Sequence, residues 1–298
     1  TNRAEIVVAD AADVTPRTMI LSGFVGKAFN GVTLRNCRNT GNISFSSPAL
    51  YMIGGFVGAV QEDDGLYTIA DCHNTADFDN AGSNSGWNFM GGIAGKTISR
   101  QLVPGETSNY RLIVEECSST GTISIAGPSK VRASGIVAQT QGAYRISGCT
   151  FSGAIESTDA TKRDVVIGGI MAMADKECVG LVEGCTFSGR ISAAQAGANN
   201  FFGGIYGNNG GAASVVNDCR TTASAYVGCP IGKSVGMLAG RPNKKGFTVS
   251  TCRCAGTGTN KQGAAWVITA GNLEDWMFAG YGTSVAVTLK NNGYNDGK

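Results

Sequence analysis

The chain has 298 residues and a net charge of +2, with 42% hydrophobic and 15% charged residues. This near-neutral charge gives no electrostatic reason to expect a nucleic-acid partner, and the hydrophobic share excludes a disordered tail. No apolar run reaches the ~18 residues that a spanning helix needs, so we expect no membrane insertion by this segment.

Residues 1–17 contain one apolar run, Ile6-Val7-Val8, followed by a polar stretch. We interpret them as a first strand or cap of the domain that follows, and not as a separate domain. No signal peptide stands at Thr1, so we expect the sequence to be a mature or trimmed form.

From residue 21 onward one pattern returns again and again. It is a Gly-Gly pair followed by Ile or Phe, with Gly or Ala two positions further on. The pattern is seen best at residues 52–58, 90–95, 167–172 and 202–207. A cysteine stands between the copies at a constant phase, as Cys37, Cys72, Cys117, Cys149, Cys185, Cys219 and Cys252. The residue three positions before each cysteine is apolar. The residue four positions after it is Gly or Ala, where we expect a tight turn or a positive φ.

Each unit contains three short β-type runs bounded by Gly, Asn, Asp and Ser, and none shows a helical period. Because the phase is the same in every unit, equivalent residues should stack in ladders ~4.8 Å apart. The sequence therefore predicts an all-β fold. We expect a single-stranded right-handed parallel β-helix, a solenoid of about seven three-stranded coils over residues 18–262, with residues 263–298 as a continuous C-terminal cap. A β-propeller is the main alternative, but its blades need four antiparallel strands.

Equivalent residues of successive coils form columns, and the inward columns predict contacts in the interior of the solenoid. The Gly-Gly pair lets the backbone pass close to a neighbouring wall. Asn39 should bond to Asn74 in the next coil, and Phe151 should stack on Phe187.

The Gly-Gly-Ile/Phe-x-Gly pattern, preceded by Asn36-Cys37-Arg38-Asn39-Thr40-Gly41, resembles the GLUG-type repeats of bacterial surface and secreted proteins, over about residues 21–256. The resemblance implies a cell-surface β-helix of adhesive or unknown role, and it brings no catalytic residues. It also implies an extracellular or bacterial cell-surface location.

The ten cysteines invite disulfides, but stacking in one column holds neighbouring Cβ atoms too far apart for easy bridging. We expect buried free thiols. Cys252-Arg253-Cys254 is too tight a spacing for a zinc site, so we predict no metal and no cofactor. His73, the one histidine, occupies an outward position and is expected to be a surface residue. We assign no catalytic residue.

The longest insertions fall in one coil, at residues 79–89 and 96–110. Function concentrates on such loops. We therefore predict a ligand-binding site formed by Trp87 and Asn88 in the first loop and by Asp63 and Asp64 in an acidic corner. Trp87 would offer an aromatic surface to a sugar ring, with side-chain amides for its hydroxyl groups.

These observations favour a monomeric, exported, adhesin-like binding protein that is not an enzyme, with a glycan or a host or matrix surface as its partner. A carbohydrate-active enzyme, either a polysaccharide lyase or a hydrolase with its site in a groove along the rod, is the first alternative. A purely structural stalk is the second.

Overall fold

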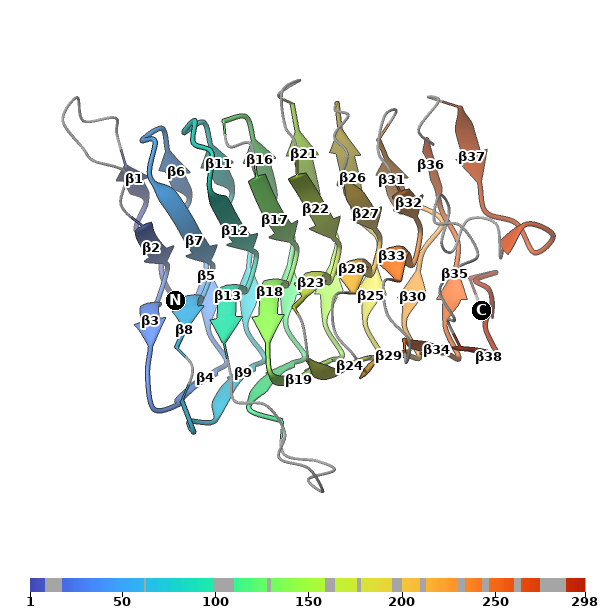
Figure 1. Ribbon diagram of the computed structural model, residues 1–298, viewed down its shortest axis with the longest axis horizontal. Helices are drawn as coiled ribbons and strands as arrows, with labels where there is room; N and C mark the ends of the chain where they lie inside the picture. Colours follow the sequence, from blue (N-terminus) through green and yellow to red (C-terminus); the bar gives the residue numbers. More distant parts are fainter. Residues whose placement is uncertain are drawn as a thin grey trace.

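The protein is a rod of stacked β-coils, with the two ends of the chain at opposite ends of the rod (Figure 1). The computed structural model describes residues 1–8, 18–61, 63–98, 110–127, 130–158, 164–175, 178–194, 200–209, 213–229, 234–242, 247–259, 264–273 and 288–297. Strands that are far apart in sequence pair in parallel from coil to coil, so the predicted parallel β-solenoid is confirmed.

Five sheets run along the rod, and we number them in the order in which a coil visits them. Sheet I contains β1 (Ile6–Val8), β6 (Ile43–Phe45), β11 (Phe78–Asn80), β16 (Thr122–Ile125), β21 (Ala154–Ser157), β26 (Arg190–Ala193), β31 (Tyr226–Gly228), β36 (Thr257–Thr259) and β37 (Ala265–Val267). Sheet II contains β2 (Thr18–Ser22), β7 (Leu50–Gly54), β12 (Trp87–Gly91), β17 (Lys130–Ser134), β22 (Asp164–Gly168), β27 (Phe201–Gly203) and β32 (Ser234–Gly236). Sheet III contains β3 (Val25–Ala28), β8 (Val57–Val60), β13 (Ala94–Ile98), β18 (Val137–Gln141), β23 (Met171–Ala174), β28 (Tyr206–Asn209) and β33 (Ala239–Pro242).

The remaining two sheets complete each coil. Sheet IV contains β4 (Val32–Arg35), β9 (Tyr67–Ala70), β14 (Leu112–Glu115), β19 (Ala143–Ser147), β24 (Val179–Glu183), β29 (Ala213–Asn217), β34 (Thr248–Ser250) and β38 (Thr288–Lys290). Sheet V contains β5 (Arg38–Asn39), β10 (His73–Asn74), β15 (Ser118–Ser119), β20 (Thr150–Phe151), β25 (Thr186–Phe187), β30 (Arg220–Thr221), β35 (Arg253–Cys254) and β39 (Gly293–Tyr294). Coil 1 is β2–β6, coil 2 is β7–β11, and the count continues in fives to coil 7, β32–β36.

A coil therefore holds five short strands, whereas three were predicted. The Gly-Gly run, interpreted as one strand, is divided by a bend into a sheet II strand and a sheet III strand. The predicted run before the cysteine is the sheet IV strand, and the two-residue sheet V strand after the cysteine was not predicted. One divided run and one additional strand therefore turn three predicted strands into five.

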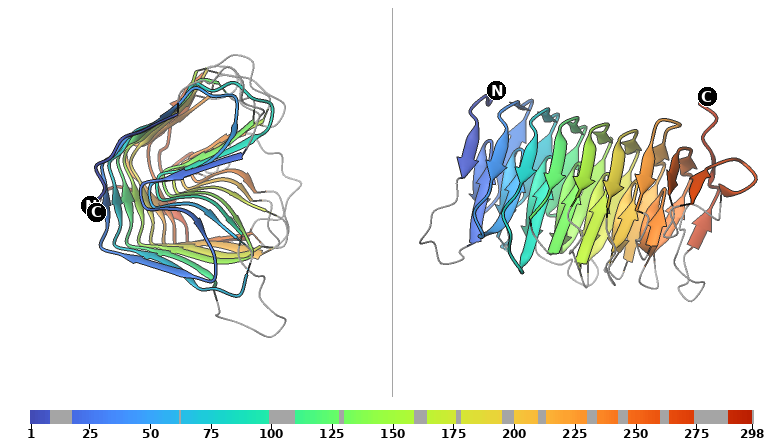
Figure 2. Two further views of the ribbon diagram at one scale, coloured as in Figure 1. Left: turned by 90° about the vertical axis from the view of Figure 1, so that its left-hand side faces the viewer. Right: turned by 90° about the horizontal axis from the view of Figure 1, so that it is seen from above.

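The Gly-Gly bend carries the chain into the interior of the rod. Seen down the long axis, every coil turns inward between sheets II and III (Figure 2). A Cβ added at Gly55 would lie 2.9 Å from Oδ1 of Asn74 on sheet V, and one at Gly135 would overlap the ring of Phe151. The predicted close passage is confirmed, and the wall that the bend reaches is the inner face of sheet V.

Strand alternation builds the core. In β7, Tyr51 and Ile53 point inward and are fully buried, while Leu50 and Met52 point outward. The predicted interior ladders are present. Asn39 donates to Asn74 over 2.8 Å, and Phe151 stacks on Phe187 with ring centroids 6.1 Å apart.

All ten cysteines are free, and all except Cys37 are buried, as predicted. The residue just before each column cysteine has a positive φ, between 47° and 62°, as in Asn36, Asp71 and Thr251. The positive φ was expected four residues after the cysteine, but among those positions only Gly256 has one. At the other glycines of this column a Cβ would overlap backbone of the preceding coil, as at Gly121 against Ala76.

The C-terminal segment both covers and extends the rod. β37 pairs antiparallel with β36, and its Trp266 is only 4% exposed. β38 and β39 then add parallel strands to sheets IV and V. Trp276 and Phe278, which were expected to pack in the cap, lie outside the described residues.

Candidate functional site

The inward bend sets the outward faces of sheets II and III opposite each other (Figure 2), and a hollow lies between these faces in coils 1–3. We call the surface between the two faces the groove and the faces themselves its walls. Register aligns outward side chains in columns along each wall, and one column of each wall passes through the hollow. On the sheet II wall the successive residues are Ile20, Met52, Phe89, Arg132, Val166 and Phe201. On the sheet III wall they are Lys27, Ala59, Lys96, Gln139, Met173, Asn208 and Arg241.

In coils 1–3 the walls stand apart around a hollow of about 250 Å³. Ile20, Met52 and Ala59 give it an apolar floor, and Lys27 and Lys96 bring two cations to it. The remaining lining residues are Thr18, Val60, Gln61 and Ile98. An apolar surface with a few convergent polar groups is the usual form of a binding site.

In coil 4 the groove contains a hydrogen-bonded charge network. The guanidinium of Arg132 donates to Oε1 of Gln139 across the groove. Oδ2 of Asp175 accepts from Nε2 of Gln139 at 2.9 Å and from Nε2 of Gln141 at 2.5 Å. Burial lowers the pKa of Arg132, and the charge of Asp175 opposes that shift.

Aromatic rings surround the same guanidinium. Cζ of Arg132 lies 4.3 Å from the ring centroid of Trp87 and 5.6 Å from that of Phe89. Nζ of Lys96 lies 5.2 Å from the Phe89 centroid. Both cations are thus held against one ring by cation–π attraction at the edge of the open hollow.

Beyond coil 4 side chains fill the groove. Val166, Ala172 and Phe201 form a small buried cluster separate from the main core, and Met173 packs against it. Cζ of Arg241 lies 4.6 Å from the Phe201 centroid and bridges the two walls. The space for a ligand is therefore in coils 1–3.

Of the predicted site residues, Trp87 and Asn88 are adjacent but face opposite ways. Trp87 was expected in a loop; it is instead the first residue of β12, half-buried on the groove wall. Asn88 points inward and is fully buried. Its amide donates to Asn84, Gly86 and Lys130 and accepts from the backbone of Tyr51, so it holds the corner together.

Asp63 and Asp64 follow β8 of sheet III, whereas Trp87 begins a strand of sheet II. Asp63 accepts hydrogen bonds from the Tyr67 hydroxyl at 2.6 Å and from the backbone of Asn30 and Gly65. Partial burial favours its neutral form, but these bonds outweigh burial and hold the pKa of Asp63 below its ordinary value. Asp63 stabilises a corner, and Asp64 is exposed beside it.

The single histidine belongs to the outer face of sheet V. His73 contacts Oγ of Ser118 at 2.8 Å and Oδ1 of Asp71 at 3.0 Å. Within the described part of the chain, no group of three or more His, Cys, Asp or Glu residues is arranged to hold a metal ion.

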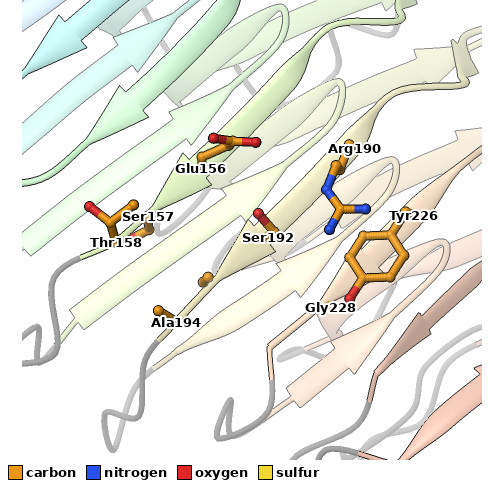
Figure 3. A pocket seen from close by; sticks show the side chains of 9 residues that line it. Glu156, Ser157, Thr158, Arg190, Ser192, Ala194, Tyr226 and Gly228 are labelled. Carbon is orange, nitrogen blue, oxygen red and sulfur yellow. The ribbon is translucent and has the colours of Figure 1, made fainter.

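A second hollow, of about 310 Å³, lies on the outer face of sheet I (Figure 3). Glu156, Arg190 and Ser192 line it with Tyr226, whose ring lies across Gly228, where a Cβ would meet it. The Arg190 guanidinium lies 4.0 Å from the Tyr226 centroid. The two charged residues of this second hollow, Glu156 and Arg190, have opposite signs, whereas the hollow of the groove combines two lysines with an apolar floor.

The groove residues Lys27, Met52, Lys96 and Arg132 were not predicted. A signal for two of them was present, because Lys27 and Lys96 stand four positions after the second residue of the repeated bend. Elsewhere that column holds Ala59, Gln139, Met173, Asn208 and Arg241, so its chemistry varies from coil to coil.

Fold and hollow together define a β-solenoid with an amphipathic groove. Comparisons with family models, with curated proteins and with solved structures found no match for this chain. The residues that the structure describes include no helix with both the length and the apolar character needed to cross a membrane.

Proposed function

We propose that this protein is a non-enzymatic binding protein of the cell surface or extracellular space, and that the open groove of coils 1–3 holds a glycan chain lengthwise. The observation that carries the proposal is the hollow between the walls, with its apolar floor and its lysines. Sugar rings present apolar C–H faces and polar hydroxyl rims, which match such a surface. The GLUG-like repeats support an adhesin-like role at a bacterial surface, and we expect the protein to act as a monomer.

Two aromatic side chains near the hollow add to its binding surface. Phe29, which follows β3, is 53% exposed, and Nζ of Lys27 lies 4.8 Å from its ring centroid. Trp87 is half-buried on the opposite wall. Ring stacking on such side chains would add affinity without demanding one particular sugar.

The carbohydrate-active enzyme remains the first alternative. Asp164 at the start of β22 and Asp175 after β23 are carboxylates of the groove region, but Asp175 already accepts two amide hydrogen bonds. A hydrolase needs two carboxyl groups flanking the scissile bond. We therefore expect neither new reducing ends nor unsaturated products when the protein is incubated with acidic and neutral polysaccharides. Reproducible turnover would reverse this choice.

The binding test uses two matched blocking variants and a glycan array followed by calorimetry. Ala59→Trp fills the groove hollow, and Ser192→Trp fills the hollow on sheet I. We expect Ala59→Trp to abolish glycan binding and Ser192→Trp to preserve it, with both variants retaining the β-type circular dichroism of the parent. The reverse result would place the ligand on sheet I. Absence of binding by the parent protein to every glycan would support the stalk alternative.

A further inference from the structure

We propose that the ligand of the groove is an anionic glycan, a polysaccharide whose sugars carry carboxylate or sulfate groups. This inference rests on the proposed function and adds the chemical class of the ligand. Among the described residues that line the hollow there are two lysines and no acidic residue.

The two lysines are spaced along the direction of the bound chain. Lys27 is in register with Ala59, and Ala59 is in register with Lys96. Two coil spacings therefore separate the lysine Cα atoms, about 10 Å along the rod. Ile20 and Met52 lie on the opposite wall of the same hollow. A sugar ring would contact the apolar floor while anionic substituents at its two ends meet the cations.

Arg132 adds positive charge in coil 4, on the opposite wall of the groove. Burial lowers the pKa of Lys96, and the nearby charge of Arg132 lowers it further, while Asp175 acts in the opposite direction. The two cations thus repel each other against the Phe89 ring that both contact. An anion bound between them would relieve this repulsion.

Arg132 also retains a donor for such an anion. Its Nε is buried and has no hydrogen-bond partner in the structure, although its Nη1 donates to Gln139. Buried donors without an acceptor are rare in proteins, and a water or ion bound at the donor is one recognised reason for them. An anionic oxygen, such as that of a carboxylate, makes a stronger hydrogen bond with a guanidinium than a neutral acceptor does.

The direction of the groove favours a glycan over an acidic peptide. A ligand that runs along the rod crosses the strands of sheets II and III at a steep angle. Strands in the interior of these sheets, such as β7 and β12, already pair with a neighbour on each side. The groove thus offers side chains and no ladder of free backbone groups, which is what an extended peptide would need for strand addition.

The experiment compares matched ligands and matched variants by calorimetry. The probes are oligogalacturonates of increasing length and their methyl esters, which have the same backbone without the charge. A sulfated oligosaccharide and its desulfated form make a second pair. We expect the charged member of one pair to bind at least about tenfold more tightly than its neutral partner, and the preference to fall as salt is raised.

Two substitutions at one position isolate the charge of the hollow. Ala59→Gln and Ala59→Glu place side chains of nearly equal size between the lysines. We expect Ala59→Glu to lose about tenfold more affinity than Ala59→Gln. Lys27→Gln and Lys96→Gln should each weaken binding of the charged probe. Lys290→Gln, on the exposed β38, removes the same charge outside the groove and should not.

The possible failures can be told apart. Equal binding of charged and neutral partners would overturn this inference and leave the proposed function standing. A Lys290→Gln variant as impaired as Lys96→Gln would show non-specific attraction and overturn the inference too. Binding of polyglutamate in the groove, blocked by Ala59→Trp, with no glycan bound, would overturn both proposals in favour of an acidic peptide.

Discussion

The two halves of the groove follow the same backbone path and differ in their outward side chains. In coils 1–3 the walls enclose a hollow, with Lys27 and Lys96 both on the sheet III wall. In the later coils Val166, Met173 and Phe201 meet and pack outside the main core. The inward bend is common to both halves, so the backbone alone does not make a binding site.

What separates the halves is the size and charge of two outward columns. Ala59 in coil 2 leaves space at the register position that Met173 fills in coil 5. The network of Arg132, Gln139 and Asp175 lies at the boundary between them. Four changes follow, in order of expected effect. The first three test the two halves of the groove and their boundary, and the fourth tests the burial of the cysteine column.

The largest effect is expected from Phe201→Ala in the filled half. Phe201 is 2% exposed, and its loss leaves a cavity beside Val166 and below Arg241. We expect a loss of about 3–5 kcal/mol in the free energy of unfolding, measured by urea denaturation. The matched variant is Met52→Ala, whose side chain borders the open hollow, with an expected loss of about 1 kcal/mol or less. Equal losses would mean that the open half is packed as tightly as the filled half.

The boundary network should respond less strongly. Gln139 is 1% exposed and connects Arg132 to Asp175. Gln139→Ala removes both contacts and leaves buried polar groups without them, so we expect a loss of about 1–3 kcal/mol in the same measurement. Gln141→Ala removes the hydrogen bond that its amide donates to Asp175 and leaves Gln139 connecting Arg132 to Asp175, so it should cost less. A Gln139→Ala variant as stable as the parent would contradict a structural role for the network.

Lys96 should give stability a dependence on alkaline pH. Burial and Arg132 lower its pKa in the folded state, so the unfolded chain binds more protons between that value and about 10.5. Where the unfolded state binds more protons, stability rises with pH. The parent protein should therefore gain stability across this window relative to Lys96→Gln, which lacks the titrating group. Urea denaturation at several alkaline pH values measures the difference, and parallel curves would contradict the assignment.

The smallest effect concerns the thiols of the first coil. Cys37 is half-exposed, whereas the other nine cysteines are buried. The burial of these nine thiols keeps a reagent from reaching them. A thiol reagent should therefore modify one cysteine rapidly in the native protein and none in Cys37→Ser. Rapid reaction of several thiols would show that the inner column is more open than the structure indicates.

The repeat could be predicted because inward side chains obey the same constraint in every coil. The cysteine column, the Asn39–Asn74 pair and the Phe151–Phe187 stack follow directly from phase. The division into five sheets could not be predicted, since a bend inside an apolar run leaves its hydrophobic pattern unchanged.

The candidate site was harder to predict for a related reason. Lys27 and Lys96 stand on an outward column that no interior contact constrains, and only the register shows that they face one hollow. Trp87 was selected as an unusual aromatic residue and assigned to a loop, whereas it begins β12. Asn88 and Asp63 were chosen for their polar chemistry, which local backbone hydrogen bonds already use. Polar residues near a corner therefore deserve a structural explanation first.

The corner before each cysteine has a consequence for how the rod can change in length. Each unit carries its own left-handed residue, and the following thiol donates to the carbonyl two residues earlier, as Cys72 does to Ala70 over 3.2 Å. The backbone conformation that turns the chain is thus set within each unit, whereas the stacking energy comes only from the adjacent coils. Whole coils could therefore be duplicated or deleted without redesigning their neighbours. Because each coil adds outward residues to both walls, the same copying step would set the length of the groove.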